Sequence, residues 1–487
     1  MHKDMNSRRS KSPAPESRKA KVKKRAGENS ATLCRKLRDK KEAETGSPVK
    51  PTATQRKRAH GSILHYIYKN TLGQSLHSHL RQCLQEPFVR SLSSYLFHAA
   101  TSPFDRRITS LEWHPTHPTT LAVASKGGDI NLWDYELPTK RMMIQGNGPG
   151  DSIGGMKFCP MDHSRVYVAS VEGTLNVQSF EGHAATILSR TGDCGHDHHN
   201  VCCWYCCVDV SISRQMLVTG DNLGKLLLLG LDGQKIFSGK LHKAKVSHAE
   251  FNPRCDWLLA TASVDHTVKL WDLRNMKDKT NFLHEMPHEK AVNSACFNPL
   301  DGSKLLTTDQ YDQIRVYSSH DWSKPQQIIQ HPHRQFQHLS PIKATWHPVY
   351  DLIVVGRYPD DRVCLGDQRT VDIFDSNTAE LVCQLQDSVV AGIKSINKFS
   401  PTGEVIGSGM GVTVLIWCRN KSLGDGNQQE ETSTSAQSLR SERSGQQRSA
   451  RNRRVADVEA KLKKKLLSLK ETETRTKTKS TKQSKKH

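Results

Sequence analysis

The sequence predicts an all-β fold in which seven repeated units close into a β-propeller, preceded by a helix-loop-helix and flanked by disordered basic tails. From Thr109 onward the chain consists of short apolar strands separated by turns. The same pattern returns about every 45 residues, which is typical of a repeat architecture. Each unit has two apolar faces that only stacking against its neighbours can bury, so the units are expected to form a closed ring.

Each unit opens with a strand that ends in an aromatic residue, usually with a proline two positions later. Six units show this start: Trp113-His114-Pro115, Phe158-Cys159-Pro160, Phe251-Asn252-Pro253, Phe297-Asn298-Pro299, Trp346-His347-Pro348 and Phe399-Ser400-Pro401. The third unit keeps the strand around Val208 without the proline. Seven third strands follow, at residues 130–134, 174–177, 226–229, 267–272, 314–317, 371–374 and 414–417. They predict seven blades.

Two of these third strands end in an explicit Trp-Asp pair. The pairs are Trp133-Asp134 and Trp271-Asp272. Together with the sevenfold count, they resemble the WD-repeat family over roughly residues 104 to 420. The resemblance implies a seven-bladed WD-repeat propeller, which we assign to residues 102–420. Propellers of this kind are commonly binding platforms, so the function has to be sought in their loops.

Ahead of the repeats, apolar residues recur at helical spacing between Ser62 and Ala100. Gly73 and Pro87 interrupt this run, which predicts a helix-loop-helix over residues 62–101. A pair of amphipathic helices beside a β domain typically caps it or docks onto a partner.

The two ends of the chain hold its positive charge. Residues 1–60 contain 19 Lys and Arg against 6 Asp and Glu, and residues 421–487 contain 18 against 8. The net charge of +22 therefore lies in the tails, and the middle of the chain is close to neutral. Residues 1–61 have too few apolar side chains to fold, and residues 421–487 are expected to form a basic low-complexity tail that is helical in part. Such tails favour nucleic acid or chromatin as a partner and fit nuclear localisation.

The most distinctive loop runs from His331 to Pro341, before the sixth unit. It presents Phe336, Gln337 and His338 in sequence. An aromatic ring, an amide and an imidazole at an exposed hairpin tip can wedge into a base stack and fill the space of expelled bases. The alternative is a proline-bounded loop whose side chains cover the end of a blade.

Several segments resemble a family of lesion-binding WD-repeat subunits of UV-damaged DNA-binding complexes. They are residues 103–107, 125–130, 262–265, 334–338 and 354–360. The resemblance implies that Phe336, Gln337 and His338 insert at photolesions, cyclobutane pyrimidine dimers and 6-4 photoproducts, in double-stranded damaged DNA. It further implies DNA backbone or lesion contacts from a second set of residues: Arg106, Lys126, Lys245, Trp204, Tyr358 and Arg334.

A second implied surface binds a ubiquitin ligase. Trp271-Asp272-Leu273-Arg274 resembles the ending of WD-repeat propellers that a large adaptor recruits to cullin 4 and its RING subunit. The helix-loop-helix occupies the place of the family's adaptor-docking helices. The expected adaptor contacts are Trp271, Asp272, Arg274, Leu76, Leu80, Leu84 and Phe88. Chromatin and histones are then the expected ligase targets, and the expected process is global-genome nucleotide excision repair.

Other classes of function are disfavoured by the sequence. His196 to His199 and Cys202 to Cys207 offer metal-ligand types, but thiols on a strand alternate between faces and diverge, so we expect no metal site. We find no phosphate-binding loop or nucleophile–base set, so we expect neither a cofactor nor catalysis. No apolar run suits a membrane span, and the cysteines suggest reduced thiols in an intracellular protein. The remaining alternative is a nuclear WD-repeat scaffold that binds histone or ribonucleoprotein.

Overall fold

The computed structural model describes residues 77–137, 139, 141–192, 202–334, 340–359 and 368–420, with side chains from Arg81 onward. The two tails and the first predicted helix lie outside the described residues, as do Leu76, Phe336, Gln337 and His338. The side chain of Leu80 is also outside them. Expectations about these residues stay predictions.

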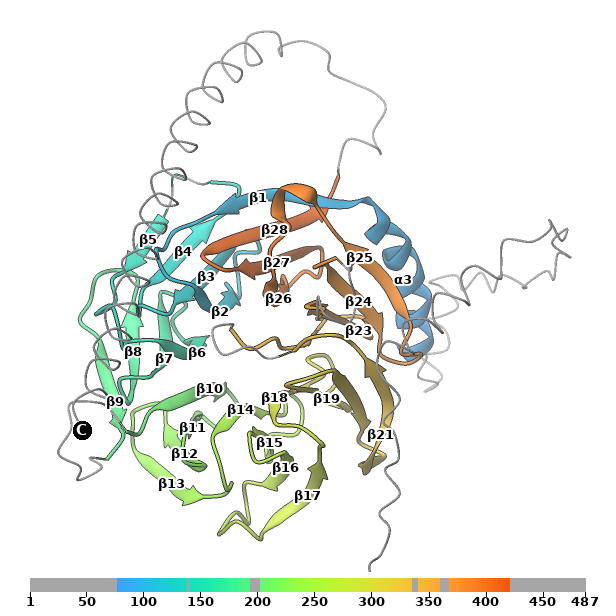
Figure 1. The fold of residues 1–487 in the computed structure, drawn as a ribbon. Coiled ribbons are helices and arrows are strands. Elements are labelled where there is room, and N and C mark those ends of the chain that lie inside the picture. Colours follow the sequence, from blue (N-terminus) through green and yellow to red (C-terminus); the bar gives the residue numbers. More distant parts are fainter. Residues whose placement is uncertain are drawn as a thin grey trace, which may run out of the picture. The chain divides into compact units, whose positions relative to one another are not determined.

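Seven four-stranded antiparallel sheets follow one another around a ring (Figure 1). Blades one to three contain β2 (Ile108–Trp113), β3 (Thr120–Ser125), β4 (Ile130–Asp134), β5 (Arg141–Ile144), β6 (Ile153–Phe158), β7 (Arg165–Ser170), β8 (Thr174–Ser179), β9 (Thr186–Arg190), β10 (Tyr205–Ser211), β11 (Met216–Asp221), β12 (Lys225–Gly230) and β13 (Lys235–Lys240). Blades four and five contain β14 (Val246–Phe251), β15 (Leu258–Ser263), β16 (Thr267–Asp272), β17 (Phe282–Pro287), β18 (Val292–Phe297), β19 (Lys304–Asp309), β20 (Gln313–Ser318) and β21 (Asp321–Gln330).

Blades six and seven complete the ring. They contain β22 (Thr345–Trp346), β23 (Leu352–Gly356), β24 (Val371–Asp375), β25 (Leu381–Leu385), β26 (Lys394–Phe399), β27 (Val405–Met410), β28 (Thr413–Arg419) and β1 (Tyr95–Thr101). The 3-10 turn η2 (Ser388–Val390) precedes β26. The predicted third strands are β4, β8, β12, β16, β20, β24 and β28, so the seven-bladed propeller is confirmed.

The ring closes between the two ends of the propeller. β1 pairs antiparallel with β28, from Tyr95 opposite Arg419 to Thr101 opposite Val414. The helical prediction is therefore wrong for residues 95–101. The reason is that an unpaired edge of β28 offers backbone hydrogen bonds to an incoming strand, and these outweigh local helical preference.

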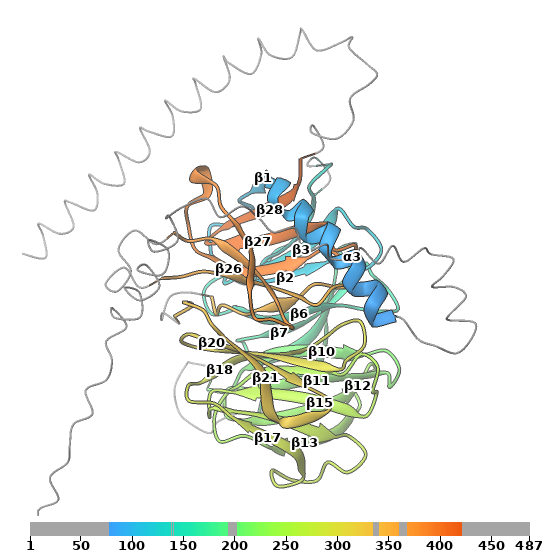
Figure 2. The ribbon, with the colours of Figure 1, turned by 90° about the vertical axis from the view of Figure 1, so that its right-hand side faces the viewer.

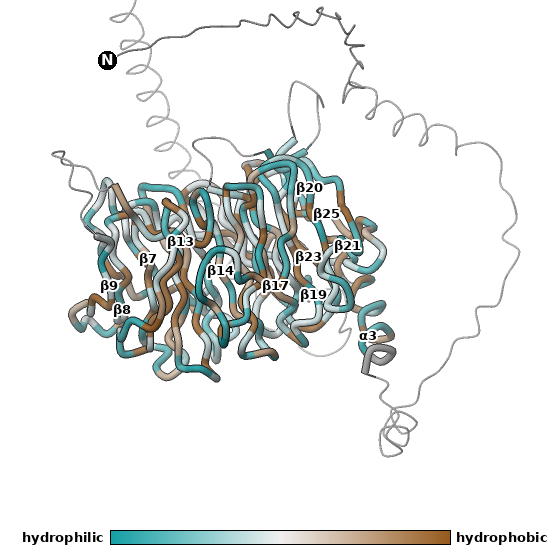
Figure 3. Tube along the Cα trace, turned by 90° about the horizontal axis from the view of Figure 1, so that it is seen from below, coloured by the Kyte–Doolittle hydropathy of each residue, from teal (hydrophilic) through white to brown (hydrophobic). Residues whose placement is uncertain are grey.

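One helix is described ahead of this strand. α3 (His77–Ser91) contains Pro87 within it, and the 3-10 turn η1 (Leu92–Ser94) leads into β1. Phe88 and Val89 on α3 pack with Leu92 against the apolar core of blades six and seven. Figure 2 shows α3 lying along the ring, and Figure 3, in which the ring is seen edge-on, places it at one rim. Among the described residues, no helix is long and apolar enough to cross a membrane.

The core lies between neighbouring blades rather than at the centre of the ring. A typical cluster joins Val218 and Leu228 of blade three to Phe251 and Trp271 of blade four. Trp133, Trp271 and Trp417 are all buried below 3% exposure. This packing fixes each blade against the next and leaves the loops at the two rims available for binding.

Candidate nucleic-acid interface

The predicted DNA contacts gather at one rim of the ring. In an antiparallel blade, the loop before the first strand and the loop between the second and third strands reach the same rim. Every predicted contact that the structure describes lies in such a loop: Arg106 before β2, Lys126 after β3, Trp204 before β10, Lys245 before β14, Arg334 before β22 and Tyr358 after β23. The fold thus brings together side chains that are far apart in the sequence.

Arg106 and Lys126 lie beside each other in blade one. The Lys126 backbone N–H donates to the Arg107 carbonyl at 2.8 Å, and Ser125 Oγ accepts from the Gly127 N–H at 2.9 Å. A Cβ on Gly127 would lie 2.8 Å from Cδ of Arg106, so the Arg106 side chain packs closely against this turn. The Lys126 side chain is exposed on a well-braced turn, as a phosphate contact requires.

Trp204 is held by a neighbouring asparagine. The Trp204 backbone N–H donates to Asn222 Oδ1 at 2.9 Å, and the Trp204 backbone carbonyl accepts from the Asn222 backbone N–H at 3.1 Å. The indole is part-exposed. Trp204 borders the central channel together with Lys126 and Lys245. An aromatic side chain that shares a channel mouth with two cations is suited to stacking on an extruded base.

The base of the predicted hairpin is anchored by two buried histidines. His331 and His333 stack with ring centroids 5.2 Å apart, and their Nδ1 atoms are 3.1 Å apart. His331 Nε2 lies 3.5 Å from the Asp372 carboxylate, and His333 Nε2 lies 3.1 Å from the Asp309 carbonyl oxygen. Burial lowers the pKa of His331 to about 4, although Asp372 opposes this shift. The pair therefore fixes the base with an uncharged His331 at neutral pH.

The far side of residues 335–339 is anchored as well. Ser340 is buried and donates its hydroxyl to the Ile108 carbonyl of blade one at 2.5 Å. Asn293 of blade five donates its side-chain amide to the Ile342 carbonyl at 3.1 Å. The segment that contains the predicted insertion residues is therefore tethered at both ends to the ring.

A cluster of basic and aromatic side chains stands next to this base. The Arg334 guanidinium lies over the Tyr311 ring at 5.0 Å and donates to its hydroxyl at 3.3 Å. Lys290 Nζ approaches the same ring to 5.5 Å, and Arg369 lies 5.9 Å over Tyr358. Sequence reasoning missed Tyr311, Lys290 and Arg369. Tyr311 could have been predicted from its position in the repeat. It lies in the loop after β19, between the second and third strands, which is the loop that contains Lys126 in blade one.

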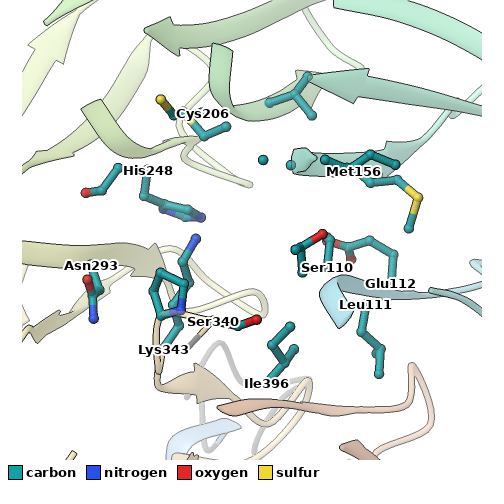
Figure 4. Close-up of a pocket in the computed structure, with 18 of the residues that line it drawn as sticks. Ser110, Leu111, Glu112, Met156, Cys206, His248, Asn293, Ser340, Lys343 and Ile396 are labelled. Atoms are coloured by element: carbon teal, nitrogen blue, oxygen red, sulfur yellow. The ribbon is translucent and has the colours of Figure 1, made fainter. Parts of the chain in front are cut away.

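Below this rim lies a channel of about 450 Å³ along the axis of the ring. Its walls are the first strands of the blades, and Lys343 and His248 point into it (Figure 4). Lys157 pairs with Asp209 at 3.2 Å and Lys398 with Glu112 at 2.6 Å. Lys343 forms no ion pair with any described residue, and burial lowers its pKa.

α3 marks the opposite rim. Arg81 pairs with Asp351 at 2.9 Å and with Asp301 at 3.4 Å, and both aspartates lie in turns between first and second strands. Phe88 faces the ring, with its centroid 4.8 Å from His347 and 5.0 Å from Tyr350. Leu84 faces away and is 51% exposed. Of the predicted adaptor contacts on this helix, Leu84 is accessible and Phe88 supports the helix from beneath.

The ending of β16 presents Arg274 at the same rim as α3. Arg274 donates to both carboxylate oxygens of Asp272, at 2.9 and 2.7 Å, and lies 4.4 Å over the Trp257 ring. Trp271 is fully buried and donates its indole N–H to Thr261 at 2.8 Å. Asp272 and Arg274 are therefore surface groups, and Trp271 holds the strand that presents them.

Comparison with known proteins agrees with this architecture. The model of the WD domain, G-beta repeat, matches residues 90–134 and 233–272. DNA damage-binding protein 2 of Danio rerio is 58% identical over 460 residues, which cover 93% of this chain and 90% of the relative. The chain belongs to the DNA damage-binding protein 2 family. The family protein of Gallus gallus is 61% identical over 363 residues, covering 74% of this chain and 72% of the relative.

More distant members of the DNA damage-binding protein 2 family share less of the chain. Protein DAMAGED DNA-BINDING 2 of Arabidopsis thaliana is 28% identical over 324 residues, covering 64% of this chain and 57% of the relative. The Danio rerio match is longer than residues 77–420, so it also includes parts of the tails. The likeness is therefore not limited to the propeller.

Proposed function

We propose that this chain recognises UV-induced photolesions in double-stranded DNA, both cyclobutane pyrimidine dimers and 6-4 photoproducts. The observation that carries the proposal is that Lys126, Trp204, Lys245 and Arg334 lie in loops at one rim, the rim that also holds the two anchored ends of the predicted hairpin. The printed names of the relatives, DNA damage-binding protein 2, support it.

The proposed mechanism separates positioning from selection. Arg106, Lys126 and Lys245 neutralise backbone phosphates, which holds the duplex against the rim without reading its sequence. Phe336, Gln337 and His338 then enter the base stack and occupy the space of the extruded bases. Extrusion of a normal pair costs a few kcal/mol, and a crosslinked dinucleotide has already lost part of its stacking. Insertion therefore succeeds preferentially at lesions.

The aromatic residues at the rim would stack on the bases that the hairpin displaces from the duplex. Asn222 holds the Trp204 backbone, and the Tyr358 backbone pairs with that of His333 at the base of the predicted hairpin. Stacking on an aromatic plane contributes about 1–3 kcal/mol per base and tolerates any base. Arg334, held against Tyr311, places a positive charge beside the point of entry.

We further propose that the opposite rim binds the large adaptor subunit of the UV-damaged DNA-binding complex. Asp272, Arg274 and Leu84 are exposed or part-exposed there. The chain would then be a non-catalytic, nuclear substrate receptor that links cullin 4 and its RING ligase to damaged chromatin and histones, and so initiates global-genome nucleotide excision repair. DNA and the adaptor would be able to bind this chain at the same time, because they would use different rims.

The test is an electrophoretic mobility shift with two duplexes of identical sequence, one of which contains a single 6-4 photoproduct or cyclobutane dimer. We expect tighter binding to each damaged duplex. The triple variant Phe336→Ala, Gln337→Ala, His338→Ala should lose this preference and keep weak, salt-sensitive binding. Adding the adaptor should shift the lesion complex further, and Arg274→Glu should prevent that second shift.

The matched control is the triple variant Lys277→Ala, Asp278→Ala, Lys279→Ala, in an exposed loop between β16 and β17 at the other rim. It should keep the full lesion preference. Equal affinity of the unmodified chain for damaged and undamaged duplexes would contradict the proposal and favour the general nuclear scaffold. Unfolding of the hairpin variant would show that the loop has a structural role instead.

A further inference from the structure

Three metal-ligand side chains meet inside the central channel, away from the rim that would bind DNA. They are His248 and Glu250 on β14 and Cys296 on β18. One ligand atom from each lies within 4.8 Å of the other two. They differ from residues 202–207, where adjacent thiols on one strand point to opposite faces.

The strand geometry explains why these side chains converge. His248 and Glu250 are two positions apart on β14, so they point to the same face of the strand. β14 and β18 are the innermost strands of blades four and five, which are neighbours in the ring. Cys296 therefore faces the pair from the adjoining blade.

Hydrogen bonds hold two of the three side chains in place. His248 Nδ1 lies 2.8 Å from the Ala295 carbonyl oxygen, which fixes the Nδ1–H tautomer and leaves the Nε2 lone pair available. Glu250 Oε1 accepts from the Phe297 N–H at 2.9 Å, which leaves Oε2 available. Both bonds are made to the residues that flank Cys296. Metal-ligating imidazoles and carboxylates are oriented by outer partners of this kind.

The spacing of the available atoms suits an ion better than a direct bond. His248 Nε2 and Glu250 Oε2 are 3.9 Å apart, which is beyond hydrogen-bonding distance. Two ligands about 2.1 Å from a tetrahedral zinc ion are about 3.4 Å apart, so a small closure would suffice.

We propose that His248, Glu250 and Cys296 bind a Zn²⁺ ion that joins blades four and five. Zinc accepts nitrogen, oxygen and sulfur ligands together, and a thiolate with a carboxylate neutralises its charge. Three cations lie near this cluster: Lys157 and Lys398 are already paired with Asp209 and Glu112, and Lys343, whose pKa burial lowers, forms no ion pair with any described residue. The fourth ligand position faces the channel, where water can occupy it. The ion would brace the ring independently of DNA binding.

The experiment measures metal in the full-length chain after treatment with a chelator and addition of Zn²⁺ or Co²⁺. We expect one zinc per chain by elemental analysis and, with cobalt, the near-ultraviolet absorption of a cobalt–thiolate bond. Cys296→Ser should remove that absorption and weaken zinc binding at least tenfold. Zinc should raise the Tm of the unmodified chain and leave the Tm of this variant unchanged.

Cys206→Ser is the matched control. Cys206 borders the same channel, and its thiol lies 3.7 Å from the Trp204 carbonyl, a bond that serine can also make. This variant should keep the zinc and the cobalt absorption. If Cys296→Ser does not fold, Glu250→Gln, which keeps the bond from Phe297, should show the same loss of zinc affinity. The proposal would be overturned if the chain binds no stoichiometric zinc. It would also be overturned if the Cys296→Ser and Glu250→Gln variants retain the zinc.

Discussion

At the scale of single residues, the rim depends on side chains whose backbones are fixed before DNA arrives. Lys126 illustrates this, because its turn is braced by Ser125 and Arg107 while its ammonium stays in solvent. Such a group contributes charge without needing to order its surroundings. Its effect on binding should therefore be electrostatic and the same for damaged and undamaged duplexes.

We predict that Lys126→Ala weakens binding to damaged and undamaged duplexes by a similar factor. Removing one phosphate contact should reduce the slope of log K against log salt by about 0.9. Fluorescence anisotropy titrations at several salt concentrations measure both effects. Lys277→Ala removes an equally exposed lysine from the opposite rim and should change neither. A loss confined to the damaged duplex would mean that Lys126 reads the lesion itself.

At the scale of elements, the base of the predicted hairpin contains a buried titratable group, His331. The pKa of His331 falls from 6.5 to about 4 in the fold, chiefly through burial. A histidine whose pKa drops on folding stabilises the protein above pH 6.5, and that contribution is lost as the pH falls from 6.5 towards 4. At pH 5 the loss for this one site is of the order of 2 kcal/mol.

We predict that the Tm of His331→Gln falls less between pH 7.5 and pH 5 than the Tm of the unmodified chain. Glutamine keeps hydrogen-bonding capacity and cannot become charged. His288 and His347, whose pKa values burial also lowers to about 4, contribute equally to both curves. His183→Gln, at a side chain that is 63% exposed, is the control and should follow the unmodified chain. Parallel curves for His331→Gln would show that this imidazole does not control the acid sensitivity.

The second element with a testable role is α3, which Arg81 ties to blades five and six. We predict that Arg81→Ala loosens the helix by about 1–2 kcal/mol, because two charge-assisted hydrogen bonds to Asp351 and Asp301 are lost. Hydrogen exchange in residues 77–91 should accelerate, and the rest of the ring should be unaffected. Arg90→Ala is the control, since its contact with Glu86 is exposed and 4.0 Å long. Unchanged exchange in α3 would show that its other contacts, the packing of Phe88 and Val89 and the hydrogen bonds of Gln85, hold the helix without Arg81.

The elements also show what the sequence could and could not reveal. The seven third strands were predictable because each repeats the same local pattern. β1 was not, since the spacing of Leu92, Tyr95 and Leu96 suits a helix, and the strand forms only by pairing with β28. Likewise the family resemblance predicts roles for Lys126 and Arg334, which stay predictions, but the contact between Arg334 and Tyr311 joins neighbouring blades and leaves no local signature.

At the scale of the whole molecule, charge and selectivity are separated along the chain. The two tails together carry +23, slightly more than the net charge of +22, and residues 61–420 carry −1. In the proposed mechanism, binding to any duplex by counterion release depends on the total of basic groups, whereas lesion preference would depend on the geometry at one rim. The tails should therefore raise affinity for all DNA, and the rim should set the ratio between damaged and undamaged DNA.

We predict that a chain ending at Asn420 binds undamaged DNA more weakly and with a shallower salt dependence, while its ratio of lesion to undamaged affinity is kept or raised. The removed segment carries 18 basic and 8 acidic residues, and each phosphate contact it made contributes equally to both duplexes. Ring closure is preserved because β28 ends at Arg419 and the Asn420 N–H still reaches the Ser94 carbonyl at 3.0 Å. Restoring residues 421–487 with their lysines and arginines changed to glutamine should not restore the lost affinity. If truncation lowers the ratio of the affinity for damaged DNA to the affinity for undamaged DNA, part of the damage recognition would instead belong to the tail.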